Sequence, residues 1–144
     1  YMLDGDKLRR GFCGDLGFSD DDRIENIRRA AEVAGLFRDA GLVTLCTFIS
    51  PFAAGRAEAR RIADGRFLEV WVRAGLETCK ARDPKKLYQK ALEGKIRSFT
   101  GIDSPYEEPT DAELVLDTEV LSEEECVNRL TDAVFDYLEG GDTL

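Results

Sequence analysis

The chain has 144 residues, enough for one compact domain with its own core and too few for two domains of ordinary size. Asp and Glu number 29 against 20 Lys and Arg, and the net charge of −9 argues against nonspecific nucleic-acid binding through a basic surface. The chain has no histidine, which excludes a Ser–His–Asp triad, a histidine base and histidine metal ligands.

The four cysteines are widely spaced and form no CxxC pair. They predict reduced thiols and neither a zinc ribbon nor a disulfide framework. Cys46 lies in an apolar run and is expected to fill the core. No apolar stretch approaches the ~20 residues that a membrane-spanning helix needs, and the start carries no signal-peptide pattern. We therefore expect a cytoplasmic protein that binds neither membrane nor nucleic acid.

Strand and helix patterns alternate along the chain. Residues 1–3 are typical of the end of a buried strand and lead into an acidic turn at 4–6, so we expect further sequence upstream. Ser19 predicts a capped helix that ends at Gly41. The apolar run 42–49 predicts a strand buried on both faces. The remaining predicted elements are a helix over 53–64, a strand over 67–72, a helix over 76–81, a loop over 98–103, a strand over 113–117 and a helix that Ser122 caps and that ends near residue 138.

This alternation predicts an α/β fold with a parallel sheet, helices on both faces, and ligands at the carboxyl ends of the strands. Residues 80–97 are markedly basic, although the chain as a whole is acidic. Clustered cations of this kind favour a lid that closes on polyanionic substrates. A solvated helix face is the alternative interpretation.

Two carboxylates, Asp4 and Asp6, flank a glycine directly after the first strand. Such a pair can hold a magnesium-bound water or orient a hydroxyl nucleophile. Arg9 lies within one helical turn and can grip a phosphate or sulfate. The alternative is an acidic turn with a helix-capping Asp and a solvated Arg.

Arg23 and Asn26 lie three residues apart on the helix that follows Ser19, so they project from one face. The positive helix N-terminus beside Arg23 suits an anion. The alternative is a surface arginine paired with Asp20 or Asp21, and Phe18 next to the helix start is either a hydrophobic staple or a base-stacking ring.

A third strand end carries Ile49, Ser50 and Pro51. The proline forces an exposed turn that presents the Ser50 hydroxyl and the Ile49 backbone at the sheet edge. Without a histidine to activate it, Ser50 is not expected to be a hydrolase nucleophile. Capping of the next helix by Ser50 is the alternative.

In chain order, these blocks resemble the adenylylsulfate kinase family. The similarity runs from residue 3 to about 118 and is specific because the blocks keep the family order. The matching blocks are Leu3-Asp4-Gly5-Asp6 with Arg9, Asp15-Leu16-Gly17-Phe18-Ser19, Arg23 with Glu25-Asn26-Ile27-Arg28-Arg29, Phe48-Ile49-Ser50-Pro51, Arg82-Asp83-Pro84-Lys85 with Leu87-Tyr88, and Phe99-Thr100-Gly101-Ile102-Asp103-Ser104-Pro105-Tyr106-Glu107.

The resemblance implies a P-loop kinase fold: a three-layer sandwich over residues 1–144, with a lid at approximately 80–104. It implies transfer of the γ-phosphoryl group of ATP, with Mg²⁺, to the 3′-hydroxyl of adenylylsulfate, which yields 3′-phosphoadenylylsulfate for sulfate assimilation. A homodimer and, in some members, a fused ATP sulfurylase are also implied.

Site roles carry over from the same family. Asp4 would orient or deprotonate the 3′-hydroxyl, Ser50 matches a position described as phosphoserine in some members, and Asp6 would help to hold Mg²⁺. Phe18 and Phe99 would sandwich the adenine. The substrate-binding residues implied by the resemblance are Asp6, Arg9, Phe18, Arg23, Asn26, Ile49, Ser50, Lys85, Ser98 and Phe99.

The chain departs from the family in one respect: the phosphate loop GxxxxGK(S/T) is absent from its sequence. In the family this loop lies upstream of the position of Asp4, so we expect a longer protein to supply it and the 144-residue chain alone to be poorly stable. The alternatives are a noncatalytic or regulatory domain that binds adenylylsulfate or its product, and a different small-molecule P-loop kinase. The block at 99–103 favours adenylylsulfate.

Overall fold

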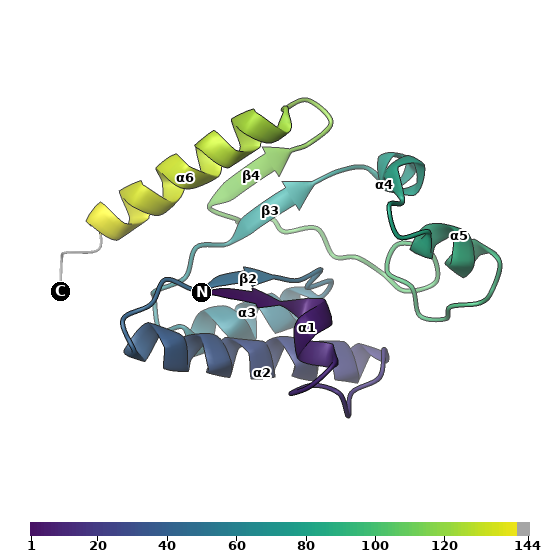
Figure 1. Ribbon diagram of the computed structural model, residues 1–144, viewed down its shortest axis with the longest axis horizontal. Coiled ribbons are helices and arrows are strands. Elements are labelled where there is room, and N and C mark those ends of the chain that lie inside the picture. The colour runs from purple at the N-terminus through teal and green to yellow at the C-terminus, as the bar shows by residue number, and fades with distance from the viewer. Residues whose placement is uncertain (141–144) are drawn as a thin grey trace. The chain divides into compact units, whose positions relative to one another are not determined.

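The computed structural model describes residues 1–140, which divide into two compact units (Figure 1). The first unit combines Tyr1–Phe67 with Arg97–Glu108. The second combines Leu68–Ile96 with the described residues from Pro109 onward. None of the helices in residues 1–140 combines the length and the apolar character needed to cross a membrane.

The first unit is a parallel strand pair with two long helices packed together beside it (Figure 1). Leu3 lies opposite Cys46 in the pair. The two helices pack where buried Gly55 of one faces Ile27 of the other, and a Cβ at Gly55 would lie in ordinary contact with the Cβ of Ile27, at 3.8 Å. The elements are β1 (Met2–Asp4), α1 (Gly5–Arg9), α2 (Asp20–Asp39), β2 (Leu45–Thr47) and α3 (Ala53–Ile62).

The structure corrects two local expectations in this unit. Within the apolar run 42–49 only Leu45–Thr47 form a strand, and Cys46 is exposed instead of filling the core. Among the described residues β2 pairs with β1 alone, so in this part of the chain the run belongs to a two-stranded sheet. The residues after β1 form the first turn of α1 and not a simple acidic turn.

The second unit is also a parallel strand pair, on which one long helix packs. Trp71 lies opposite Val115, and Leu116 is buried. Ser122 caps the last helix as predicted, because its Oγ accepts the N–H of Glu125 at 3.2 Å. The elements are β3 (Val70–Arg73), α4 (Leu76–Arg82), α5 (Leu87–Leu92), β4 (Leu114–Asp117) and α6 (Glu123–Gly140).

The basic segment expected to form a lid is helical over much of its length, since it contains the end of α4 and all of α5. The carboxylate of Asp83 accepts the N–H groups of Leu87 at 2.8 Å and Gln89 at 3.0 Å, which fixes the start of α5. Residues 97–104, the remainder of the expected lid, belong to the first unit.

Candidate functional site

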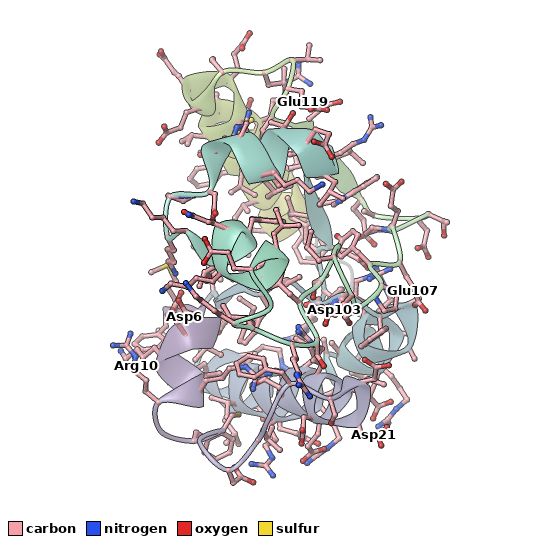
Figure 2. All side chains as sticks on the ribbon, turned by 90° about the vertical axis from the view of Figure 1, so that its right-hand side faces the viewer. Asp6, Arg10, Asp21, Asp103, Glu107 and Glu119 are labelled. Carbon is pink, nitrogen blue, oxygen red and sulfur yellow. The ribbon has the colours of Figure 1, made fainter. Side chains whose placement is uncertain are left out.

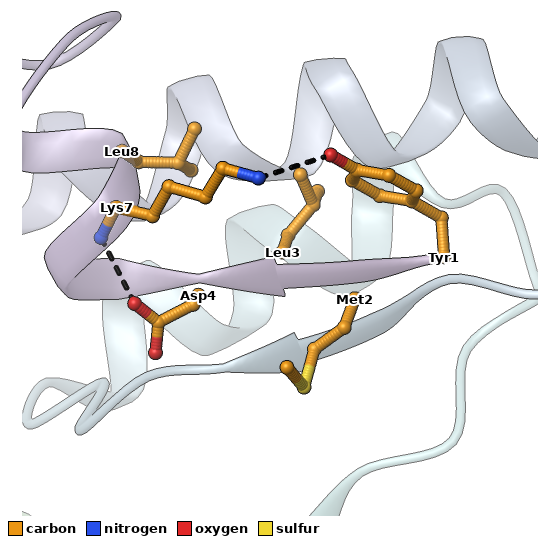
Figure 3. A pocket seen from close by; sticks show the side chains of 6 residues that line it. All are labelled: Tyr1, Met2, Leu3, Asp4, Lys7 and Leu8. Atoms are coloured by element: carbon orange, nitrogen blue, oxygen red, sulfur yellow. Dashed lines mark hydrogen bonds between the residues drawn. The ribbon is translucent and has the colours of Figure 1, made fainter.

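Asp4 lies where β1 passes directly into α1. Its Oδ1 accepts the backbone N–H of Lys7 at 2.9 Å and so caps α1, whereas its other carboxylate oxygen has no hydrogen-bond partner in residues 1–140 (Figure 3). Gly5 follows close to the end of β2, because a Cβ there would lie 3.4 Å from the carbonyl oxygen of Thr47 and 3.1 Å from Cδ1 of Phe48, the residue after β2. The ends of the two strands are thereby held together, with one oxygen of Asp4 available to a ligand.

A hollow of about 170 Å³ lies beside β1 and α1 (Figure 3). Over it the ammonium group of Lys7 donates to the Tyr1 hydroxyl at 3.4 Å. The hollow shares Asp4 with the candidate site, but neither Arg23 nor Phe99 lines it, and it is smaller than the 300–1,000 Å³ typical of ligand pockets. It therefore does not mark a nucleotide site by itself. Its lining residues are Tyr1, Met2, Leu3, Asp4, Lys7 and Leu8.

Arg9, at the end of α1, stacks on Phe18. Its guanidinium carbon lies 4.5 Å from the ring centroid, and Nη1 donates to the carbonyl of Gly17 at 2.7 Å. Gly17 is confined, because a Cβ there would lie 2.9 Å from Oδ2 of Asp22. The Phe18 ring is 56% exposed, so it is not a buried staple but a ring open to a ligand.

Arg23 lies one turn into α2, which Ser19 caps as predicted by accepting the N–H of Asp22 at 3.2 Å. Arg23 is 8% exposed and is not a solvated surface arginine. Its Nε–H donates to the carbonyl of Phe18 at 3.1 Å, and its Nη2 donates to the carbonyl of Ser98. One guanidinium thus joins the start of α2 to the loop that carries Phe99.

Arg9 and Arg23 lie close together without an ion pair. Within residues 1–140 neither side chain forms an ion pair with a carboxylate. Burial lowers the pKa of Arg23 and the nearby charge of Arg9 acts in the same direction, whereas the charges of Asp20 and Asp103 oppose this shift. Two neighbouring cations without a paired carboxylate favour the binding of an anion.

Asn26, one turn beyond Arg23, is 4% exposed, and its Oδ1 is buried without a hydrogen-bond partner in the described structure. The buried hydroxyls of Thr100 and Ser104 in the same unit also have no partner. Buried polar atoms are normally satisfied, so these groups indicate places where a ligand or ordered water completes the structure.

The turn after β2 presents Ile49 and Ser50 as expected. Ile49 is exposed, and Ser50 adopts a left-handed conformation with φ of 45°. Arg56 holds this turn by donating from Nη1 to the Ser50 carbonyl at 2.8 Å. This hydrogen bond fixes the backbone of the turn that carries the Ser50 side chain.

Ser50 does not cap α3, which corrects the alternative interpretation of this residue. The N-cap is Phe52, and Oε2 of Glu107 accepts the N–H of Ala53 at 2.6 Å. The backbone N–H of Glu107, a residue labelled in Figure 2, also donates to the carbonyl of Pro51 at 2.8 Å, which joins two segments that are distant in the sequence. Sequence reasoning missed this role, for which the only signal was the place of Glu107 in the last matching block.

Asp6 is an exposed carboxylate in the first turn of α1. Residues 1–140 contain no group of three His, Cys, Asp or Glu side chains that could hold a metal. Mg²⁺ bound to a nucleotide keeps mainly phosphate and water ligands and takes one or two carboxylates from the protein. A single carboxylate such as Asp6 fits that kind of site and no all-protein cage.

The predicted residues of the first unit therefore fall into two connected groups. Arg9, Phe18, Arg23 and Ser98 are joined by direct contacts, with Phe99 adjacent in the chain. Asp4 and Asp6 share α1 with Arg9, and Asp4 lies opposite Thr47 in the strand pair that leads to Ile49 and Ser50. Lys85 is an exposed residue of the second unit and is not in either group.

Comparisons with known proteins show the family to which the chain belongs. The family model described as adenylylsulphate kinase matches residues 1–117. The adenylyl-sulfate kinase of Marinobacter nauticus is 56% identical over 131 residues, which cover 90% of this chain and 66% of that protein. The probable adenylyl-sulfate kinase of Halalkalibacterium halodurans is 57% identical over 131 residues, which cover 90% of this chain and 65% of that protein. The chain thus spans just under two-thirds of the length of these two curated relatives.

Among solved structures, the Mycobacterium tuberculosis APS kinase CysC in complex with AMPPNP and APS has a TM-score of 0.84 and 44% identity. The match covers 96% of this chain and 79% of that one. The predicted α/β fold of the P-loop kinase type is thereby confirmed. The chain belongs to the adenylylsulphate kinase family.

Proposed function

We propose that the protein containing this chain transfers the γ-phosphoryl group of ATP to the 3′-hydroxyl of adenylylsulfate. The product is 3′-phosphoadenylylsulfate, the activated sulfate donor of sulfate assimilation. The observation that carries the proposal is the position of Arg23, whose guanidinium bonds to the carbonyls of both Phe18 and Ser98. Arg9 lies beside it, and neither arginine forms an ion pair in the described residues.

The proposed substrate roles follow from the contacts that join Arg9, Phe18, Arg23 and Ser98. Arg9, Arg23 and the unpartnered amide oxygen of Asn26 offer charge and hydrogen bonds to the phosphosulfate group. Phe18 and Phe99 offer aromatic faces for the adenine, and stacking of a base on one such ring contributes about 1–3 kcal/mol. A family member of known structure was solved with APS and AMPPNP bound, which supports the same two substrates for this chain.

Asp4 is the proposed catalytic carboxylate. The carboxylate oxygen of Asp4 that does not cap α1 accepts the proton of the 3′-hydroxyl. It also orients the 3′-oxygen of the substrate toward the γ-phosphorus of ATP. Phosphoryl transfer depends chiefly on alignment and on stabilisation of charge, which carboxylates and arginines supply without histidine. Mg²⁺, when bound with ATP, neutralises phosphate charge, and Asp6 is the residue of this chain that would help to hold it. Ile49, Ser50 and Ser98 contact the nucleotide from their loops.

The remaining expectations rest on family membership. We propose one kinase domain over residues 1–144, a mobile lid that includes Lys85, and a homodimer. A fused or partner ATP sulfurylase and a cytoplasmic location are proposed on the same basis. Phosphorylation of Ser50 is not needed, because direct in-line transfer accounts for the reaction.

The proposal is tested by assaying the full-length gene product with MgATP and adenylylsulfate and identifying the phosphorylated position by NMR. We expect a phosphate on the 3′-oxygen. A correctly folded protein that binds adenylylsulfate without turnover would support a noncatalytic binding domain instead. Phosphorylation of another small alcohol in preference to adenylylsulfate would support a different P-loop kinase.

A further inference from the structure

The backbone at Ser98 is pinned from both sides. Its N–H donates at 2.8 Å to Oδ2 of Asp103, which is labelled in Figure 2, and its carbonyl accepts a hydrogen bond from Arg23. Between these two bonds Ser98 adopts a left-handed conformation with φ of 55°. This region is unfavourable for a non-glycine residue, so the conformation persists only where neighbouring groups hold it.

The same carboxylate holds the next residue. Oδ1 of Asp103 accepts the N–H of Phe99 at 2.5 Å, so each carboxylate oxygen binds one amide. The carbonyl of Phe99 accepts the N–H groups of Ile102 at 3.0 Å and Ser104 at 3.1 Å. With both its N–H and its carbonyl bonded, the backbone of Phe99 is fixed, and only side-chain rotation remains to direct the ring.

We propose that Asp103 is a positioning residue that sets the Phe99 ring against the adenine of adenylylsulfate, an inference that rests on the proposed function. Asp103 touches neither substrate nor metal in this role. It holds the peptide between Ser98 and Phe99 in its left-handed turn, from which the ring projects. Without the carboxylate, that peptide relaxes toward ordinary φ values and the ring loses its stacking position.

The carboxylate is suited to this task at neutral pH. The N–H groups of Phe99 and Ser98 lower the pKa of Asp103, so the side chain remains ionised and both oxygens act only as acceptors. An amide at this position would offer one acceptor oxygen and turn a donor toward the second N–H. The predicted role therefore requires aspartate and is not met by asparagine.

The test compares Asp103→Ala with Asp111→Ala in the full-length protein. Asp111 is an exposed aspartate of the second unit without a hydrogen bond in the described structure, so its removal is a matched loss of charge. We expect Asp103→Ala to raise the KM for adenylylsulfate about tenfold and to leave the KM for ATP unchanged. A merely structural role would instead lower the thermal midpoint and affect both substrates.

A double-mutant cycle shows whether Asp103 acts through the ring. In the Phe99→Ala background, Asp103→Ala should add less than a twofold further increase in the KM for adenylylsulfate. If the two substitutions raise the KM for adenylylsulfate independently, so that their fold-increases multiply in the double variant, the proposal is overturned. If Asp103→Ala does not fold, Asp103→Asn carries the same measurements, because it keeps the side-chain shape and loses one acceptor.

The outcomes separate this proposal from the one on which it rests. A wild-type protein that does not phosphorylate adenylylsulfate contradicts the proposed function and the positioning role together. An active wild-type protein in which Asp103→Ala matches Asp111→Ala contradicts the positioning role alone.

Discussion

Two pairs of arginines in the first unit show how differently one side chain can be used. Arg28 and Arg29, in the middle of α2, are compensated: Arg28 binds Glu25 at 2.7 Å, and Arg29 binds Asp15 at 2.7 Å. Arg23, less than two turns earlier on the same helix, and Arg9 beside it have no carboxylate partner in the described structure. The two pairs differ in the surroundings that the fold gives them.

On the basis of this contrast we interpret Arg28 and Arg29 as structural and propose that Arg9 and Arg23 bind a ligand. Arg29 holds the loop before α2 onto the helix through its ion pair with Asp15. The hydrogen bonds of Arg23 go only to backbone carbonyls, and the nearby charges of Asp20 and Asp103 act on it without forming an ion pair. We expect an anionic ligand to supply an ionic partner, and substitutions on either side of the comparison test this expectation.

We expect the largest effect, a fall in kcat, from substitution of Asp4. Asp4 and Asp15 differ as the two arginine pairs do, because one is open to a ligand and the other is paired within the protein. Asp4 has an oxygen without a partner, whereas Arg29 donates to both oxygens of Asp15. Asp4→Asn preserves the cap of α1, because asparagine is an equally good N-cap, but removes the base. We expect kcat to fall about 100-fold or more with little change in the KM for adenylylsulfate. A kcat no lower than that of Asp15→Asn would remove Asp4 from catalysis.

The next effect sharpens the comparison of the arginines directly. Arg23→Ala should raise the KM for adenylylsulfate about 100-fold, because a charge-assisted contact and the bridge to Ser98 are both lost. Arg28→Ala should leave the KM for adenylylsulfate within about twofold of the wild-type value, since Arg28 is already ion-paired with Glu25. Steady-state kinetics on both variants, with circular dichroism as the check on folding, decide the matter. Equal KM values in the two variants would erase the distinction.

Arg29→Ala should affect stability and not substrate binding. The variant loses contacts to the exposed Asp15 and the partly exposed Glu25, so we expect a small fall in the free energy of unfolding. Urea denaturation measures this change, and the KM for adenylylsulfate serves as the control. An increase in KM comparable to that of Arg23→Ala would place Arg29 in the site after all.

The smallest effect concerns pH. Hydrogen bonds from Arg28 and Arg29 lower the pKa of Glu25 from 4.5 to about 2. Because the unfolded chain binds a proton more readily, the stabilisation by Glu25 is present above pH 4.5 and is lost as the pH falls toward 2. Urea denaturation between pH 6 and pH 3 should therefore show a steeper loss of stability for the wild type than for Glu25→Gln. Identical pH profiles would argue that this network contributes nothing to folding.

The features predicted correctly from sequence are those with local causes. Ser19 and Gly41 bound α2 through a side-chain cap and a left-handed glycine with φ of 81°, both of which depend on near neighbours. The cap of α6 by Ser122 is equally local. Burial of the run 42–49 could not be read from its composition, because burial depends on which elements cover a strand.

The connections among the candidate site residues could not be predicted from the sequence. Arg23 and Phe99 stand in recognisable blocks, yet the bond from Arg23 to Ser98 joins residues 75 positions apart. Glu107 caps α3 across 54 positions, in place of the nearby Ser50. No periodicity or spacing encodes such contacts, since they arise only when the loop folds back onto the helices.

A crystal structure of the full-length protein with adenylylsulfate tests the central claim most directly. The account predicts that the phosphosulfate oxygens accept hydrogen bonds from Arg9 and Arg23 while the adenine stacks on Phe18 and Phe99. A bound nucleotide that leaves both guanidinium groups bonded only to backbone carbonyls, with its sulfate against other residues, would contradict it.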